Sequence, residues 1–575
     1  MDPGQPPQHP DDRGHPGRTR LVLGWVSGYQ RGDLRFDVIA GVTVAALVIP
    51  KALGYAGIAL IPIQNGLYAA AAGALIYALF GTSRQISTGP SSALAAVAAG
   101  AVLATAVPVE EAPQLVAAIA VTAGVLFVLL AVFKMGWISR FLSRAVITGF
   151  LFGAAIEVVV GELPKVTGTD ASGTNSWRKF ADWLSSIGAL HTTTLLVGAV
   201  SLLTILLLRF LAPKLPGALV LVVGGLVASA WLDLAGMGVA TVGEVPRGVP
   251  TPEFPGIDVF TNHFATISIA ALAILLIGFS QTAGDARLFA SRHGYRIDVN
   301  QESVGQGMAN LGAGLFQGMP VSTSLSASSL SDSSGARSQM ASVVTGATVL
   351  LTLFVFAPLF SELPKPVLAA IIIDAVVFGM MDVAELRRLW RVDRSDLWIA
   401  VAAIVGVLTS GVLAGVVIGI VLSLGWLVYV NANPPTFELG RRPGTTTFRP
   451  LHEYPGDETY PGVFVLRFDG GLYFVTTEVL SDRLRDRTVG ADPPIEHVVL
   501  DFGAVNFIDS QGVAELDRLV GIAAERGVSL HFARVKGKVR TMLAADGVVD
   551  RVGDGHFHVS VDDAVNSVLA ETPSD

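Results

Sequence analysis

The chain has 575 residues, of which 51% are hydrophobic and only 15% are charged. Soluble domains carry about a quarter charged residues, so this deficit indicates a membrane protein. The formal net charge of −8 argues against a nucleic-acid partner, and the absence of cysteine excludes disulfide bonds and thiolate metal sites. The sequence contains no pairing of a nucleophile with a base and no phosphate-binding loop, so no enzyme activity, metal or cofactor is predicted.

Changes of composition along the chain predict its domains. The opening sequence, MDPGQPPQHPDDRGHPGRTR, is rich in proline, glycine and charge and has no apolar core of a signal peptide, which indicates a disordered or interfacial cytoplasmic segment over 1–35. Long apolar runs predict a transmembrane domain over 36–432. After Pro434 the composition becomes that of a soluble protein, which predicts a linker over 433–461 and a soluble domain over 462–575.

Fourteen membrane-spanning elements are predicted within the transmembrane domain. A helix needs about 20 apolar residues to cross the hydrocarbon core of a bilayer. Most of the candidate segments meet this length, and three others are shorter or rich in glycine and serine. The long segments are 38–57, 65–81, 112–133, 141–160, 192–211, 217–235, 264–283, 340–358, 364–380, 396–410 and 412–430, and the short ones are 86–105, 301–316 and 321–333.

The basic residues of the loops orient these elements. An even number of spans places both termini on one side, and placing them inside gives cytoplasmic loops that are rich in arginine and lysine. The opposite loops contain few basic residues beside acids such as Glu110 and Glu111. The sequence therefore predicts a multi-pass protein of the plasma (inner) membrane with both termini in the cytoplasm.

Two of the short segments resemble each other. ISTGPSSALA over 86–95 and VSTSLSASSL over 321–330 both begin with an aliphatic residue, serine and threonine, and both continue with small or hydroxyl-bearing residues. Each is the third element of a seven-element half, so the second half enters the membrane with opposite polarity and forms an inverted repeat. Paired, weakly apolar segments of this kind point to the central site of a transporter.

The chemistry of such a site follows from the peptide backbone. A half-helix that begins inside the membrane presents unpaired N–H groups and the positive end of its dipole, and both attract an anion. We therefore expect an anion between half-helices that start near 88–92 and 322–326. The alternative is that the small residues only permit close helix packing. The candidate hydroxyl donors are Ser91, Ser92, Ser324 and Ser326.

Longer stretches of the chain resemble the sulfate permease family of anion transporters, whose animal members form solute-carrier family 26. The resemblance rests on DVIAGVTVAALVIPKALGYAGIAL (37–60), on GLYAAAAGALIYALFGTSRQISTGPSSALA (66–95) and on SRHGYRIDVNQESVGQGMANLGAGLFQGMPVSTSLSASSL (291–330). The soluble part resembles a STAS domain through VVLDFGAVNFIDSQGVAELDRL (498–519). These motifs follow the order of the family over nearly all of the chain after residue 35.

The resemblance implies a polytopic α-helical membrane protein with fourteen transmembrane elements in a seven-plus-seven inverted repeat, divided into core and gate domains, plus a cytoplasmic α/β STAS domain. It implies an anion between the third and tenth elements, alternating access, contact with membrane lipid and a homodimer. Sulfate is the first expected substrate, and bicarbonate or a dicarboxylate is the alternative. Transport is expected by proton or sodium symport or by exchange. An anion channel and an anion-sensing membrane regulator that acts through the STAS domain are the other classes considered.

Three positions depart from the family pattern. Lys51 stands where the family usually has glutamine, and Ala327 follows Ser326 where many members have arginine. The acid of the eighth span that is linked to proton coupling in some members aligns with Gln281. Asp285, one helical turn later, is the second coupling candidate.

Lys51 lies alone within a long apolar segment, about 20 Å of helix beyond Asp37. A lysine at such a depth is costly, so we expect it to face a cavity or a partner. Three interpretations are open: direct contact with the anion, a pair with Asp285 that couples charge to transport, and a static pair that only fixes packing. The expected anion site comprises Lys51, Tyr55, Gly89, Ser91, Ser92, Ser324, Leu325 and Ser326.

Two other acids lie within apolar helices. Glu157 either faces the transport cavity or lies near the outer interface beside Glu162, and the second interpretation is favoured. Asp374 is similar and receives no role.

The soluble domain alternates strand and helix patterns, which predicts a mixed sheet with helices on one face. Stand-alone STAS antagonists carry a phosphorylatable hydroxyl two residues after an aspartate, and here Asp509 is followed by Ser510 and Gln511. The resemblance therefore leaves Ser510 as the regulatory candidate. The sequence HFH at 556–558 is a weak metal signal and is interpreted as a strand end.

Overall fold

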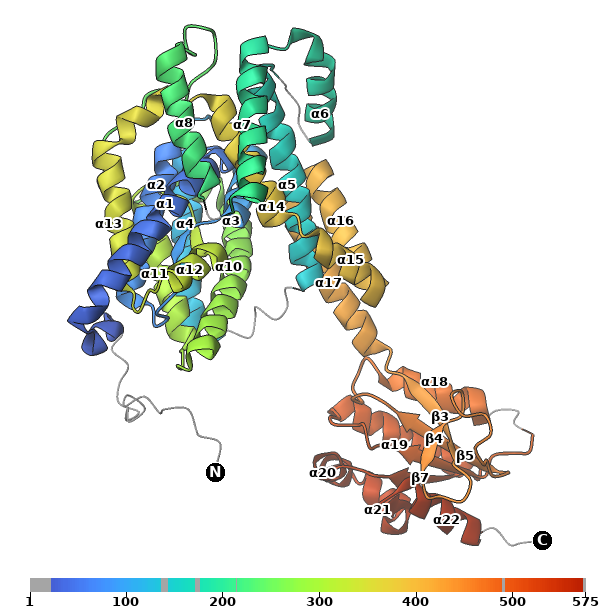
Figure 1. Cartoon of the computed structure of the whole chain (residues 1–575). Coiled ribbons are helices and arrows are strands. Elements are labelled where there is room, and N and C mark those ends of the chain that lie inside the picture. Colours follow the sequence, from blue (N-terminus) through green and yellow to red (C-terminus); the bar gives the residue numbers. More distant parts are fainter. Residues whose placement is uncertain (1–21, 136–142, 171–175, 214, 489–491, 572–575) are drawn as a thin grey trace, which may run out of the picture. The chain divides into compact units, whose positions relative to one another are not determined.

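A computed structural model describes residues 22–135, 143–170, 176–213, 215–488 and 492–571 of the chain (Figure 1). It divides into two compact units, Met1–Ser423 and Leu424–Asp575. Most of the segment predicted to be disordered or interfacial, up to residue 21, lies outside the described residues. Each unit is described by itself.

Every predicted span corresponds to a helix or to a short strand followed by a helix. The first half contains α1 (Leu34–Ile58), α2 (Ile63–Phe80), β1 (Thr88–Pro90) with α3 (Ser92–Thr105), α4 (Ala112–Val132), α5 (Arg144–Thr167), α7 (Thr192–Leu211) and α8 (Gly217–Leu232). The second half contains α10 (Phe264–His293), α11 (Val299–Leu315), β2 (Val321–Thr323) with α12 (Leu325–Ser333), α13 (Met340–Val355), α14 (Lys365–Met380), α16 (Arg394–Ser410) and α17 (Val412–Ala432).

Three further helices connect the spans. They are α6 (Ser176–Ser185), α9 (Ile257–Asn262) and α15 (Val383–Val392). In α6 and α15 the apolar and charged residues lie on opposite faces, which is typical of a helix that lies along a membrane surface. Among the described residues, eight helical segments are long and apolar enough to cross a membrane.

Contacts between the helices follow the seven-plus-seven repeat. The fourth elements of the two halves are α4 and α13, and the second elements are α2 and α11. The contact of α4 with α11 therefore has a symmetric counterpart in the contact of α13 with α2. The same symmetry relates the contacts α3–α10 and α1–α12, and the contacts α5–α16 and α14–α7. The first four elements of each half form the core domain, and the last three of each half form the gate domain. The predicted fold class is thereby confirmed.

The two half-helices start from a two-stranded antiparallel sheet. In this sheet Thr88 of β1 lies opposite Thr323 of β2, and Gly89 lies opposite Ser322. Thr88 and Thr323 are also equivalent residues of the two similar sequence segments. The pseudo-two-fold axis of the repeat therefore passes between these threonines and relates the start of α3 to the start of α12.

Small residues allow the core helices to approach closely. A Cβ atom added to Gly66 in α2 would lie 2.0 Å from the carbonyl oxygen of Ala52 in α1. Only glycine fits at this crossing, which is the packing expected of helices inside a membrane.

The second unit contains a six-stranded mixed sheet in the order β4-β3-β5-β6-β7-β8. Strands β5 to β8 are parallel to one another, and β3 is antiparallel to both of its neighbours. The strands are β3 (Thr436–Arg441), β4 (Phe448–Pro450), β5 (Val463–Phe468), β6 (His497–Asp501), β7 (Ser529–Ala533) and β8 (Phe557–His558). The helices are α18 (Thr477–Thr488), α19 (Ser510–Glu525), α20 (Gly537–Ala545), α21 (Val548–Val552) and α22 (Val561–Glu571).

Helices cover both faces of this sheet, so the prediction of helices on one face is wrong. Phe464 and Leu466 of β5 pack in a core with α18 to α21, whereas Val465 packs with Val565 of α22 on the opposite face. Alternate residues of a strand point to opposite faces, so the run of buried residues in β5 is the signal of two covered faces.

The sheet also begins before residue 462, where the sequence predicts the start of the soluble domain. Strands β3 and β4 fall within 433–461, the range predicted as a linker. Thr436 of β3 pairs with Phe468 of β5, and Leu439 is buried in the core formed with α22. Strand β4 has only three residues, and β3 directly follows Pro434 and Pro435 and contains Gly440, so their sequence pattern alone does not distinguish them from a linker.

Histidine side chains surround a buried histidine in the STAS sheet. His531 of β7 is 1% exposed, and its Nδ1 atom lies 3.2 Å from Nε2 of His558. The ring of His556 packs against it at 4.6 Å between centroids. His558 ends β8, as the strand-end interpretation of HFH expects. Burial, followed by the charges of the neighbouring histidines, lowers the pKa of His531 to about 3.

This lowered pKa predicts that acid destabilises the STAS unit. An unfolded histidine has a pKa of about 6.5, so the unfolded state binds the proton more strongly between that pH and about 3. The stability contributed by neutral His531 is therefore complete above about pH 6.5 and is lost as the pH falls toward 3. We expect hydrogen-exchange protection factors of β7 in the full-length protein to fall between pH 7.5 and 5, and to fall less in His531→Gln. An equal fall in both proteins would contradict this origin.

Candidate functional site

Serine residues cap the starts of both half-helices. The Oγ atom of Ser91 accepts a hydrogen bond from the N–H of Leu94 at 3.4 Å, and Oγ of Ser324 accepts one from the N–H of Ala327 at 3.4 Å. Each serine is the N-cap of its helix, as serine preferences predict. Both bonds are long, and one cap satisfies only one of the first N–H groups of a helix. The remaining donors are available to an anion.

The half-helices begin within the ranges expected from the sequence. Helix α3 begins at Ser92 and α12 begins at Leu325. The side chain of Leu325 is 49% exposed, and Ser326 beside it is also exposed. The start of α12 is therefore accessible, whereas most of α3 is buried.

Lys51 reaches the start of α12 from α1. Its Nζ atom donates a 2.9 Å hydrogen bond to Oγ of Ser326, which lies 3.2 Å from Oγ of Ser324. Among the described residues, no carboxylate lies within ion-pair distance of Lys51. Ala327, where many family members have arginine, is only 2% exposed. Lys51 therefore brings a positive charge to the half-helix that lacks the arginine.

One interpretation of the sequence was an ion pair between Lys51 and Asp285, and this pair is not formed in the structure. Instead, Oδ2 of Asp285 accepts a 3.0 Å hydrogen bond from the hydroxyl of Thr323. Oε1 of Gln281 accepts a 2.8 Å hydrogen bond from the hydroxyl of Ser322. The two coupling candidates thus lie one turn apart on α10 and bind successive residues of β2.

Tyr55 and Gly89 lie at the start of α3. Tyr55, one turn beyond Lys51 on α1, is 8% exposed, and α1 packs against α3, whose first residue is Ser92. Gly89 is buried in β1, yet a Cβ atom added to it would meet no atom within 4 Å. Open space therefore lies beside this buried glycine, next to the half-helix.

The structure also brings an ion pair near Lys51 that the sequence interpretation missed. The guanidinium of Arg209 in α7 donates two hydrogen bonds to Asp374 in α14, at 2.9 and 2.6 Å. Helices α1 and α14 pack together, and a Cβ atom added to Gly54 would lie 3.5 Å from Ile372. Lys51 is one turn from Gly54 on α1, the helix that packs against the one carrying Asp374. The signal in the sequence was the single acid Asp374 within an apolar span.

Ser510, the regulatory candidate, is the first residue of α19 in the STAS unit. It is exposed, and Asp509 before it caps the helix by accepting a 2.7 Å hydrogen bond from the N–H of Gly512. A modification of the Ser510 hydroxyl is therefore sterically open, and its regulatory role stays a prediction.

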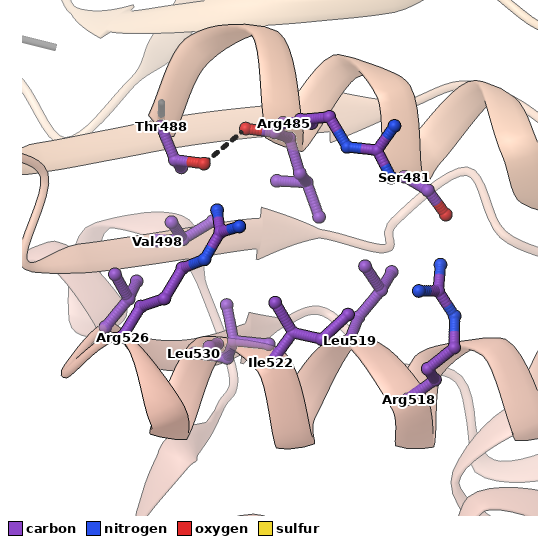
Figure 2. Close-up of a pocket in the computed structure, with 12 residues that line it drawn as sticks. Ser481, Arg485, Thr488, Val498, Arg518, Leu519, Ile522, Arg526 and Leu530 are labelled. Carbon is purple, nitrogen blue, oxygen red and sulfur yellow. Dashed lines mark hydrogen bonds between the residues drawn. The ribbon is translucent and has the colours of Figure 1, made fainter. Parts of the chain in front are cut away.

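A cavity of about 90 Å³ opens between α18 and α19 of the STAS unit (Figure 2). Its floor consists of side chains that are each less than a tenth exposed, so little apolar surface is open to a ligand. At its rim, Arg518 donates a 2.8 Å hydrogen bond to Glu515, which lowers the pKa of Glu515. This cavity lies within the packing of the STAS helices. The floor residues are Leu484, Val498, Leu519 and Leu530.

The two half-helices meet at a pseudo-two-fold axis, and a lysine lies at the accessible start of one of them. This arrangement defines an anion transporter built from inverted repeats. The comparisons with known proteins agree with this class. The chain belongs to the sulfate permease family, because the sequence model described as "Sulfate permease family" matches residues 34–403. A STAS domain matches residues 454–564. The resemblance noted in the sequence is thereby confirmed.

Relatives match the chain over most of its length. The "Probable sulfate transporter MT1781" of Mycobacterium tuberculosis (strain CDC 1551 / Oshkosh) is 33% identical over 559 residues, which cover 96% of this chain and 99% of that protein. "Sulfate transporter 4.1, chloroplastic" of Arabidopsis thaliana is 30% identical over 574 residues, which cover 95% of this chain and 82% of that protein.

Solved structures share the fold. The structure of SLC26A9 superposes with a TM-score of 0.86 at 21% identity, covering 96% of this chain and 93% of that chain. The transmembrane domain of a cyanobacterium bicarbonate transporter, BicA, superposes with a TM-score of 0.58 at 21% identity, covering 69% of this chain and 99% of that chain.

Proposed function

We propose that the chain is a secondary active transporter of small inorganic anions, with sulfate as its first substrate, that works by alternating access. The observation that carries the proposal is the contact of Lys51 with Ser326 at the accessible start of α12. The relatives named as sulfate transporters, which align over at least 95% of this chain, favour sulfate. Bicarbonate or a dicarboxylate is the alternative substrate.

In this proposal the anion binds between the starts of α3 and α12. The first N–H groups of the two half-helices, the serine hydroxyls and the Lys51 ammonium donate hydrogen bonds to its oxygens. Tyr55 and Gly89 border the anion on the α3 side. The core domain, which carries these groups, then moves relative to the gate domain and exposes the anion to the other side of the membrane.

The proposal also covers the membrane location, orientation, oligomeric state and coupling ion of the protein. It acts in the plasma (inner) membrane with both termini in the cytoplasm, as a homodimer, with a proton or sodium ion as the coupling ion. The distribution of basic residues supports the orientation. Cross-linking of the purified protein in membranes and labelling of terminal tags in intact cells test the dimer and the orientation.

Uptake of labelled sulfate by proteoliposomes containing the purified full-length chain tests the function. We expect saturable uptake that exceeds uptake by protein-free liposomes and responds to an imposed pH or sodium gradient. Stronger competition by bicarbonate or fumarate than by unlabelled sulfate would favour the alternative substrates. Absence of flux for all three anions would favour the sensing regulator, and flux that does not saturate would favour a channel.

A further inference from the structure

A cavity of about 210 Å³ lies at the end of the helical unit where α1, α3 and α5 finish. It lies between the core domain, represented by α1 and α3, and the gate domain, represented by α5 and the start of α17. This position is separate from the half-helix starts, because α3 begins at the anion site and ends at the cavity. Residues that line it include Gly57, Leu60, Ala96, Ala99, Glu157 and Glu162.

Two buried carboxylates face this cavity. Glu157 is 9% exposed and Glu162 is 3% exposed, and Oε2 of each has no hydrogen-bond partner among the described residues. Oε1 of Glu162 accepts a 2.6 Å hydrogen bond from Lys165. No cation lies within ion-pair distance of Glu157 in the described part of the chain, and Lys179 of α6 lines the same cavity. Glu157 thus lies beside Glu162, as the favoured interpretation of the sequence expects, and both residues also line a cavity that this interpretation did not include.

The remaining lining residues decide which cation the cavity takes. Apart from the two acids and the two lysines, the lining consists of glycine, alanine, valine, leucine, isoleucine and proline, so it offers no further side-chain oxygen. The described residues contain no group of three or more side chains that could hold a metal ion. A metal cation needs several oxygen ligands, whereas a proton needs one carboxylate. The chemistry of the cavity therefore fits a proton.

We propose that Glu157, supported by the Glu162–Lys165 pair, binds the proton that moves with the anion, at a site apart from the half-helix starts. This inference rests on the proposed transport function and names its coupling ion. A proton from the solution converts the Glu157 carboxylate into a neutral acid, and release of the proton restores the carboxylate. The charged groups that face Glu157 are Glu162 and Lys165 of α5 and Lys179 of α6, and the lining parts of α1, α3 and α17 carry none.

The position of the cavity explains how the proton controls transport. An unpaired carboxylate is costly to bury, whereas the neutral acid is much less so. Movement of the core against the gate changes the burial of Glu157, because the cavity is bounded by both domains. Protonation therefore favours the state in which the cavity is closed. It also removes a negative charge from the path of an anion that leaves the site on this side.

The test measures sulfate and proton flux together. Full-length protein is reconstituted in liposomes that contain the pH-sensitive dye pyranine, and labelled sulfate uptake is followed at external pH 5.5, 6.5 and 7.5. We expect the wild type to take up more sulfate under an inward proton gradient and to acidify the interior. Glu157→Gln is expected to lose the gradient response and the acidification while it still exchanges internal for external sulfate. Glu110→Gln, which changes an exposed acid, is the matched control.

Two further variants keep the test decisive. Glu157→Asp keeps a carboxylate and is expected to keep the gradient response. Lys179→Met removes the positive charge outside the spans and is expected to move the response to higher pH. A full response in Glu157→Gln, or no change in Lys179→Met, would overturn the proposed site. Sulfate uptake by the wild type without acidification would overturn the site alone, whereas absence of any anion uptake would overturn the transport function.

Discussion

Replacing Lys51 by glutamine is expected to raise the KM for sulfate uptake by roughly 10- to 100-fold, with a smaller effect on the maximal rate. The Lys51 ammonium lies at the accessible start of α12 and has no carboxylate partner among the described residues, so its charge is available to the anion. A hydrogen bond to a charged group contributes about 1.5–3 kcal/mol, which corresponds to this range of affinity. The concentration dependence of initial sulfate uptake into proteoliposomes measures the change.

Two controls separate charge from structure in this prediction. Lys51→Arg keeps the positive charge and is expected to retain more of the affinity than Lys51→Gln. The monodispersity of each variant in detergent shows whether it is folded. An unchanged KM in a folded Lys51→Gln protein would make Lys51 a structural residue whose hydrogen bond to Ser326 only fixes packing.

Removing the carboxylate of Glu302 is expected to produce the largest loss of stability in the transmembrane unit. Glu302 of α11 is 1% exposed, and its Oε1 accepts hydrogen bonds from the N–H groups of Thr82 and Ser83 at 2.7 and 2.9 Å. The hydroxyls of Thr82 and Tyr77 also donate to it. Glu302→Ala leaves these donors without an acceptor, and we expect a cost of about 3–5 kcal/mol.

The melting temperature of the full-length protein in detergent measures this loss. Glu302→Gln keeps one acceptor oxygen, so its melting temperature is expected to lie between those of Glu302→Ala and the wild type. Glu110→Ala changes an exposed acid and is expected to stay within about 0.5 kcal/mol of the wild type. Equal melting temperatures of Glu302→Ala and Glu110→Ala would contradict the structural role of Glu302.

The spans and their repeat were predictable because they depend on local properties of the sequence. Apolar length and the basic residues of the loops located each helix, and the likeness of ISTG to VSTS located the paired half-helices. The register that places Thr88 opposite Thr323 joins equivalent residues of these segments, although the sequence analysis predicted no strand there. The STAS strands with alternating residues were predictable for the same reason. Strand β4 has only three residues, and β3 directly follows Pro434 and Pro435 and contains Gly440, so both read as a linker.

The partners of the charged residues were not predictable from local sequence. Lys51 contacts Ser326, which lies 275 residues later, and Arg209 contacts Asp374, which lies 165 residues later. Glu302 binds a turn more than 200 residues before it in the sequence. Such contacts are set by the packing of the two repeats, and a single sequence shows only that an isolated charge needs some partner.

Protection of a single cysteine by sulfate tests the anion site most directly, because the chain has no cysteine of its own. Ser326→Cys places a thiol at the start of α12, and Ser329→Cys places one at an exposed position further along the same helix. If the anion binds between the half-helices, sulfate slows the reaction of a charged thiol reagent with Ser326→Cys and leaves Ser329→Cys unchanged. Equal reaction rates of Ser326→Cys with and without saturating sulfate would contradict an anion site at the start of α12.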